Sequence, residues 1–422
     1  MAAYMYYSSE SSDSENTAET SSLDFSYLML DTDSLVVHLR NSIREQHMQQ
    51  RCALQNTSSK TSRRKGASNE GESGGGGGGG GGSGEHGEGD EDRLADATYD
   101  TVTRKLLLQH NMLLTLPFEI TRFSSLVSLD LSNNNLTHVN DFLLQLPELQ
   151  TVYLQNNNLG DDGLPKELST LTRLRELNLS GNKLTLFPSQ LCEAVSLRYL
   201  YLGGNQITEI LPEIKALQSL QVLHLGGNQL ETVPDELGEL HQLGALILCD
   251  NRLRRLPRVI SSLTRLRSLL LHKNNLCCLP VGLVKLRGLM ELSLRDNPLV
   301  TRFVNSCARE LMYNPPSLLE LAARVIKLKR VEYTSRDLPR NLVGYLSHGQ
   351  RCVNPQCKGM YFTSCVEHIK FVDFCGMYRV PLMHYLCSSR CSSKTPDYYR
   401  ALSESDSEED EPSARMKRVL LG

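Results

Sequence analysis

The chain has 422 residues, a formal net charge of −3, 40% apolar residues and no tryptophan. This length is sufficient for two or three domains. The near-neutral charge argues against a general nucleic-acid binder, which carries a strong basic excess. No segment approaches the ~20 apolar residues that cross a bilayer, and the N-terminus lacks the pattern of a secretory signal. We therefore expect a cytoplasmic protein without nucleic-acid or membrane partners.

Residues 1–100 are expected to be disordered. They are rich in serine, glycine and acidic residues, and they include an unbroken glycine run at 74–82. Such a segment buries too little apolar surface to offset its ordering entropy. Residues 35–40 are more apolar and fit a short helix, a docking peptide or transient structure in a tail. Residues 394–422, with the acidic and serine-rich run 403–411, are expected to form a second disordered tail.

A repeated leucine pattern occupies residues 101–300. The template L-x-x-L-x-L-x-x-N-x-L recurs nine times, and seven of the eight steps between copies are 23 residues long. The asparagine position is filled in every copy, by Asn111, Asn134, Asn157, Asn182, Asn205, Asn228, Asn251, Asn274 and Asn297. Because one repeat cannot bury its own inner leucines, consecutive repeats must stack. We predict an α/β fold, a leucine-rich repeat solenoid of about nine repeats.

The asparagine and proline positions fit this architecture. Each asparagine follows a predicted L-x-L strand, where its amide can pair with backbone groups inside the turn. Leu-Pro or similar pairs open most of the following segments, as at Leu211-Pro212 and Leu256-Pro257. Proline ends the strand and fixes φ for a helical or polyproline-like return. The pattern resembles the intracellular class of leucine-rich repeat proteins over about half of the chain.

Solvent-facing strand positions form a candidate target-binding wall. Two neighbouring columns of the strands carry Tyr153, Tyr199, Tyr201, Val222, His224, Ile247 and Leu270. Clustered exposed apolar residues mark binding sites, and tyrosine is a favoured anchor, although such residues can also be scattered without function. The glycine pairs at 203–204 and 226–227 are expected to let a partner approach closely. No predicted base or nucleophile lies beside His224, so we interpret it as a contact residue and predict no catalytic residue.

Residues 301–350 have a helical pattern. Ser317 and Glu320 form a predicted capping box directly after two prolines. The apolar residues that follow fall on one helical stripe, namely Leu318, Leu321, Ala322, Val325 and Ile326. A second short helix is predicted over residues 337–346, with Leu342, Tyr345 and Leu346 on a shared face.

These two helices resemble the elongin and cullin boxes of ubiquitin-ligase substrate receptors. The first is similar to the elongin-C-binding box, which implies contacts of elongin C, and through it elongin B, with Leu318, Leu321, Ala322 and Ile326. The second resembles the cullin-selecting box, closer to the cullin-5 than to the cullin-2 form, and implies that a cullin with its RING subunit contacts Leu338, Pro339, Leu342, Tyr345 and Leu346. Alanine at position 322 replaces the cysteine that is more usual there. The alternative is a helix that only caps the solenoid.

Residues 351–393 are predicted to form a small cysteine-rich module. Six of the chain's twelve cysteines lie here, and the outer four are spaced Cys352-x4-Cys357 and Cys387-x3-Cys391. Two short-spaced pairs separated by a few tens of residues fit a structural zinc site, and a small β-rich core gains much of its stability from such a metal. The alternative is a set of reduced, buried cysteines. Other possible ligands are Cys365, His368, Cys375 and His384.

Taken together, the repeats, the two boxes and the cysteine pairs resemble one family of intracellular leucine-rich repeat proteins over residues 100–393. The resemblance implies a non-catalytic substrate receptor of an elongin B/C–cullin RING ubiquitin ligase, with its protein target on the repeat wall. The alternative is a signalling scaffold that recruits no ligase. A Leu318 side that is exposed favours the ligase receptor, whereas one packed into the last repeat favours the scaffold. We expect no enzymatic activity, because no phosphate-binding loop, metalloprotease motif or nucleophile elbow is found.

Overall fold

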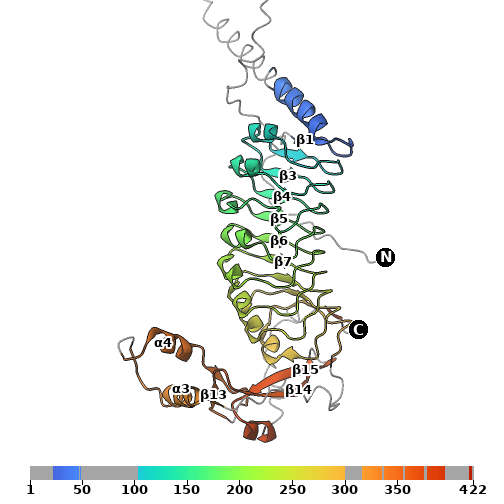
Figure 1. Cartoon of the computed structure of the whole chain (residues 1–422). Coiled ribbons are helices and arrows are strands. Elements are labelled where there is room, and N and C mark those ends of the chain that lie inside the picture. Colours follow the sequence, from blue (N-terminus) through green and yellow to red (C-terminus); the bar gives the residue numbers. More distant parts are fainter. Residues whose placement is uncertain are drawn as a thin grey trace, which may run out of the picture. The chain divides into compact units, whose positions relative to one another are not determined.

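A computed structural model of the chain describes residues 22–46, 48, 103–299, 316–334, 337–354, 357–374, 378–394 and 418–420. The chain divides into two compact units, Met1–Tyr153 and Leu154–Gly422. Both units contain the predicted leucine-rich repeats, which Figure 1 shows as a succession of short strands and turns. The glycine run at 74–82 and the acidic run at 403–411 lie outside the described residues.

Each repeat contributes one three-residue strand to the parallel sheet of its unit. The first unit contains β2 (Lys105–Leu107), β3 (Ser128–Asp130) and β4 (Thr151–Tyr153); the second contains β5 (Glu176–Asn178), β6 (Tyr199–Tyr201), β7 (Val222–His224), β8 (Ala245–Ile247), β9 (Ser268–Leu270) and β11 (Glu291–Ser293). The register is constant, so that Leu223 lies opposite both Leu200 and Leu246. These central leucines are fully buried. The predicted solenoid and the phase of its repeats are therefore confirmed.

On the return side, each of the first eight repeats forms a short 3-10 helix. The helices are η2 (Phe118–Arg122), η3 (Asp141–Gln145), η4 (Leu168–Thr170), η5 (Ser189–Glu193), η6 (Pro212–Ala216), η7 (Asp235–Glu239), η8 (Arg258–Ser262) and η9 (Val281–Lys285). Pro234 and Pro257 directly precede two of these helices in extended conformation, and Pro212 begins a third. Because proline fixes φ and lacks an N–H, it suits the first position of such a return. The helical alternative of the prediction is the one observed.

The repeat asparagines form a buried ladder within each unit. Asn274 is typical: its Nδ2 donates to the carbonyls of Leu248 at 2.8 Å and Leu271 at 3.0 Å. Its Oδ1 accepts the backbone N–H of Leu253 at 3.0 Å. One side chain thus pairs polar groups of its own repeat and of the preceding repeat, which buried backbone requires. The role predicted for the asparagine is confirmed.

The residue before each ladder asparagine has a left-handed backbone, with φ between 53° and 69° in all nine repeats. Glycine takes this conformation without steric cost, and Gly204 and Gly227 occupy two of these positions. The preceding glycines do not open the wall to a partner as expected. A Cβ at Gly203 would overlap the His224 ring, and one at Gly226 would lie 2.7 Å from the Cys249 sulfur. Side chains of neighbouring strands already fill this space.

Residues 22–46 cap the first repeat, so the expectation of disorder over residues 1–100 is wrong for this segment. Strand β1 (Ser22–Asp24) pairs in parallel with β2, and helical residues 32–46 follow. Asn111 donates to the carbonyl of Phe25 at 2.8 Å and accepts the N–H of Leu30 at 3.0 Å. Leu35 and Leu39 are fully buried. The segment therefore extends the ladder and closes a sheet edge that would otherwise present unpaired groups.

Beyond the repeats lie two helices and a small β module. They comprise α3 (Leu318–Leu328), α4 (Arg340–Ser347), β12 (Gln350–Arg351), β13 (Met360–Tyr361), the hairpin β14 (Val366–Phe374) and β15 (Tyr378–Leu386), and η10 (Ser389–Lys394). The two predicted helices are confirmed, and the strands agree with the β-rich core expected of the module. No helix in the described part of the chain has the length and apolar character to span a bilayer.

Two further strands attach the C-terminal region to the repeats. Strand β10 (Leu279–Pro280) of the last repeats pairs in parallel with β15 of the module, and β15 lies beside the lower repeats in Figure 1. Strand β16 (Arg418–Leu420) pairs in parallel with β11. The expectation of disorder over residues 394–422 is therefore wrong for these three residues, because their backbone continues the repeat sheet.

Two arginines of the repeats hold the module. The Nη1 of Arg255 donates to both carboxylate oxygens of Glu367 at 2.9 Å. The guanidinium of Arg258 lies 3.4 Å from the ring centroid of Tyr385 and donates to the sulfur of Cys365 at 3.0 Å. A guanidinium stacked on an aromatic ring and partly shielded from water gives a substantial attraction. The module is therefore packed against the last repeats as well as paired to them.

Replacing Asn274 with alanine tests the ladder. The variant leaves the Leu253 N–H buried without its partner and removes one of the two amide donors to the Leu271 carbonyl, so we expect the free energy of unfolding to fall by about 2–3 kcal/mol. Urea denaturation followed by circular dichroism measures the loss. Asn275→Ala is the matched control, because Asn275 is the adjacent residue and is exposed. Equal losses in the two variants would contradict the role assigned to the ladder.

Candidate metal centre and docking helix

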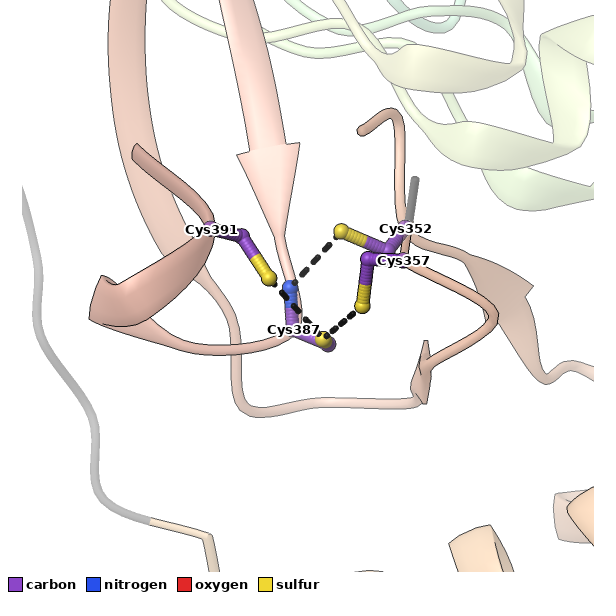
Figure 2. A group of neighbouring side chains, drawn as sticks. All are labelled: Cys352, Cys357, Cys387 and Cys391. Carbon is purple, nitrogen blue, oxygen red and sulfur yellow. Dashed lines mark hydrogen bonds between the residues drawn. The ribbon is translucent and has the colours of Figure 1, made fainter. Parts of the chain in front are cut away.

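The four outer cysteines of the module converge in space. Cys352 follows β12, Cys387 follows β15, and Cys391 lies in η10. The four sulfur atoms, including that of Cys357, all lie within 4.8 Å of one another. Figure 2 shows the four side chains pointing toward a common centre. The sequence-predicted ligand set is thus brought together and could hold a metal ion.

The spacing of the sulfur atoms suits a tetrahedral ion. A metal–sulfur distance of ~2.3 Å implies sulfur–sulfur distances of ~3.8 Å in a tetrahedron. The sulfur of Cys387 lies 3.4 Å from that of Cys357 and 3.7 Å from that of Cys391. The backbone N–H groups of Gly359 and Cys387 donate to the sulfurs of Cys357 at 3.3 Å and Cys352 at 3.5 Å. Such donors orient thiolate ligands and stabilise their charge.

Local sequence explains why these four cysteines meet. The N–H of Cys357 donates to the carbonyl of Asn354 at 3.0 Å, which closes the turn that carries the first pair. A Cβ at Gly359 would lie 2.5 Å from the sulfur of Cys387, so the site leaves no room for a side chain there. Burial raises the pKa of the Cys352 and Cys387 thiols. A bound cation would offset this cost, because metals bind the thiolate form.

The alternative ligands lie elsewhere. Cys365 is buried and accepts the hydrogen bond from Arg258. His368 and His384 lie opposite each other on the hairpin β14–β15, and burial lowers the pKa of His384 to about 4. Cys375 lies outside the described residues. Among the described residues, only the outer four cysteines form a potential metal site of three or more ligands.

Helix α3 begins as predicted but uses its glutamate differently. The Ser317 hydroxyl accepts the N–H of Glu320 at 3.2 Å, which confirms the N-cap. The Glu320 side chain is fully buried and does not complete the predicted capping box. It accepts the backbone N–H groups of Phe362 at 2.8 Å, Thr363 at 2.9 Å and Ser364 at 2.9 Å. This carboxylate therefore fastens α3 to the loop that follows β13.

Electrostatics keeps Glu320 ionised. Burial raises the pKa of its carboxyl. The backbone donors of Phe362 and Ser364 and the guanidinium of Arg324 together lower the pKa by more than burial raises it, to about 2. The Nη2 of Arg324 donates to Glu320 at 2.7 Å and to the carbonyl of Ser364, and its Nη1 donates to the carbonyl of Cys387. Sequence reasoning missed both residues as functional. The available signal was a glutamate and an arginine one helical turn apart, on the side opposite the apolar stripe.

The apolar stripe of α3 faces solvent. Leu318 is 85% exposed, Val325 is 49% exposed and Leu321 is 44% exposed, and Ala322 is also exposed. Ile326 is half-buried. Helices of globular proteins normally turn such a stripe to the core, whereas α3 instead turns Glu320 and Ala323 inward. Three of the four residues of the predicted elongin box are therefore exposed, and the fourth, Ile326, is half-buried.

The residues of the second box are divided between surface and interior. Pro339 is exposed and Leu338 and Leu342 are half-buried. Leu346 is buried. The Tyr345 ring stacks on Phe362 with 4.9 Å between centroids, and its hydroxyl lies 3.3 Å from Glu320. Tyr345 and Leu346 thus help to pack α4 against the module, which leaves the first three residues as the accessible part of this box.

The predicted target-binding residues lie on the strands as expected. In the second unit, Tyr201, His224, Ile247 and Leu270 are register neighbours on consecutive strands, and Tyr199 and Val222 form the adjoining column. All six are half-buried. Burial lowers the pKa of His224, which keeps its ring neutral. Tyr153 ends β4 in the first unit and is also half-buried.

Comparison with known proteins identifies the repeats and relatives that match most of the chain. A family described as a leucine-rich repeat region matches residues 182–312, and a second, described as a leucine-rich repeat, matches residues 125–146. The chain is similar to leucine-rich repeat-containing protein 58 of Xenopus tropicalis, with 51% identity over 76% of the chain and 90% of the relative. It is also similar to the protein of that name in Homo sapiens, with 68% identity over 67% of the chain and 77% of the relative.

Substituting Glu320 with glutamine tests how α3 is held. The amide cannot accept all of the module's N–H groups, so at neutral pH we expect amide hydrogen exchange within α3 to rise about tenfold or more. Because the carboxyl pKa falls from its usual 4.5 to about 2 in the folded chain, its stabilising effect is complete above pH 4.5 and is lost as the pH falls toward 2. The difference between the variant and the wild type, compared at equal pH, shrinks accordingly.

The exposed Glu332 supplies the control. A Glu332→Gln variant should exchange like the wild type at every pH. A difference between Glu320→Gln and the wild type that does not change between pH 6 and pH 2.5 would refute the assignment.

Proposed function

The chain belongs to the leucine-rich repeat-containing protein 58 family, and we propose that it is the substrate-recognition subunit of an elongin B/C–cullin RING ubiquitin ligase. Its membership of the leucine-rich repeat proteins is consistent with protein–protein interaction. In this proposal the target protein binds the wall of Tyr199, Tyr201, Val222, His224, Ile247 and Leu270 in the second unit, and the protein acts in the cytoplasm. Tyr153 of the first unit stays a predicted target-binding residue.

One observation supports the proposal above all: the apolar stripe of α3 is exposed while the opposite side of the helix is anchored. Leu318 is 85% exposed, and burying such a side chain in a partner is worth about 2 kcal/mol. A stripe of Leu318, Leu321, Ala322 and Ile326 offers the chemistry of an amphipathic helix that binds in a hydrophobic groove. Elongin C supplies that groove in our proposal.

The second helix supplies the contact with the cullin. Pro339 is exposed, and Leu338 and Leu342 are half-buried, so they remain accessible to a cullin-5 or cullin-2 subunit. Tyr345 and Leu346 contribute by fixing α4 on the module. The chain itself would carry out no chemistry. It would raise the local concentration of a bound target near the ubiquitin-charged enzyme that the RING subunit recruits.

We assign zinc as the metal of the four-cysteine site. Four thiolates at tetrahedral spacing favour zinc over hard cations such as Mg²⁺ or Ca²⁺. A site with four protein ligands has no open position for substrate, so the ion is structural in this proposal. It would hold together the ends of β12, β15 and η10, where Cys352, Cys387 and Cys391 lie.

The ligase proposal is tested by co-purification. Full-length protein expressed with elongins B and C is expected to form a stable complex. Leu318→Asp places a charge in the docking groove and should lower elongin capture by more than about tenfold. Quantitative immunoblotting of the captured elongin C gives the ratio.

Leu328→Asp serves as the matched control. Leu328 is 48% exposed on the same helix but lies beyond the box, so its variant should retain elongin. If the wild-type chain captures no elongin, or if both variants bind alike, the receptor proposal fails and an interaction scaffold is the better explanation.

Metal analysis tests the zinc assignment independently. Purified protein should contain about one zinc per chain, and Cys387→Ser should lose it because three ligands bind the ion far more weakly. Cys365→Ser is the control, since Cys365 lies in the same module but outside the cluster. A folded module without metal in the wild type, or equal zinc in the two variants, would exclude the assignment.

A further inference from the structure

Arg324 connects the docking helix directly to the four-cysteine site. Its Nη1 donates to the backbone carbonyl of Cys387 at 3.0 Å. Its Nη2 donates to the carbonyl of Ser364 at 2.6 Å and to Glu320 at 2.7 Å. One guanidinium thus joins α3 to a candidate metal ligand and to the loop that Glu320 itself binds. Its side chain is only 14% exposed, so these bonds are largely shielded from water.

Both anchor points of Arg324 lie next to segments that the cysteines hold. Cys387 is one of the four clustered residues, and Ser364 lies in the loop between β13 and β14. Strand β13 pairs with β12, which directly precedes Cys352. The cluster therefore helps to hold the carbonyls of Cys387 and Ser364 in the positions where they accept from Arg324.

This connection differs from an ordinary helical ion pair. An exposed pair of charges one turn apart contributes only ~0.3–0.5 kcal/mol. Here Glu320 is fully buried, and both charged groups also form hydrogen bonds with the module. Removing one partner of such a pair leaves the other charge buried without compensation, which is strongly unfavourable. The pair therefore requires an intact module beneath it.

We propose that Arg324 couples the four-cysteine metal site to the docking helix, so that α3 presents its apolar stripe only when the site holds its metal. Loss of the ion separates the segments that carry Cys387 and Ser364, removes both carbonyl acceptors of Arg324, and releases α3 from the module. The proposal rests on the elongin-docking function for its biological meaning. The physical coupling between metal and helix is independent of the identity of the partner.

The test measures α3 itself. Full-length protein, zinc-loaded or treated with a chelator, is compared by hydrogen–deuterium exchange over residues 318–328. We expect metal removal to accelerate exchange in α3 by about tenfold or more, the factor that corresponds to losing a charged hydrogen bond. Strands β5–β8 of the repeats should keep their protection and so show that the fold is retained.

The variant Arg324→Leu separates coupling from collapse of the module. It should keep about one zinc per chain, yet α3 should exchange fast even with zinc bound, and chelation should add little. Lys329→Met is the matched control, since Lys329 is an exposed cation at the end of the same helix. It should behave like the wild type.

The outcomes separate the two proposals. Unchanged α3 exchange after metal removal, or Arg324→Leu matching Lys329→Met, overturns the coupling. If α3 responds to zinc as expected but the wild type captures no elongin, the coupling stands and the ligase assignment fails. If elongin binds equally well with and without zinc while α3 exchange changes, the metal affects the helix but does not govern docking, and the proposal is overturned.

Discussion

A single 23-residue repeat has no interior of its own, so its inner leucines are buried only when neighbouring repeats stack on it. The rest of the structure depends on this stacking. Leu223 is buried because Leu200 and Leu246 flank it on neighbouring strands. The stack also encloses backbone groups, which the ladder asparagines pair across adjoining repeats. Stacking therefore creates a core, but it leaves each terminal repeat with an uncovered side. Residues 22–46 cover the first repeat, and β10 connects the last repeats to the cysteine-rich module.

Helix α3 has the opposite orientation to a typical amphipathic helix, which turns its apolar stripe to the core. Helix α3 buries a carboxylate and leaves leucines exposed to water. The buried charge of Glu320 is compensated by N–H donors of the module and by the guanidinium of Arg324 on the same helix. Polar contacts thus attach α3 to the module, and its apolar stripe stays exposed. The four-cysteine cluster is connected to these contacts through the carbonyl of Cys387. In the proposed function, the structural and docking roles would occupy opposite sides of one short helix.

Sequence reasoning succeeded where a pattern repeats or where chemistry is local. The nine asparagines and the L-x-L leucines predict the solenoid, Ser317 predicts a helix start, and the spacing of the four cysteines predicts their cluster, which could hold a metal ion. It failed where the outcome depends on contacts between distant segments. Residues 1–100 as a whole are rich in serine, glycine and acidic residues, yet Leu35 and Leu39 become buried in the segment that caps the first repeat. Glu320 fits a capping box, but its partners lie some forty residues further along the chain.

The left-handed backbone before each ladder asparagine limits which residue types can occupy that position. The nine positions hold His110, Asn133, Asn156, Gly181, Gly204, Gly227, Asp250, Lys273 and Asp296. Glycine, asparagine and aspartate suit this backbone, whereas a β-branched side chain there would be strongly strained. Substitution in this column can therefore change charge and polarity, from Asp250 to Lys273, while valine, isoleucine and threonine stay excluded. The side chains in this column can therefore differ in charge and polarity, but the left-handed backbone of the turn excludes β-branched side chains.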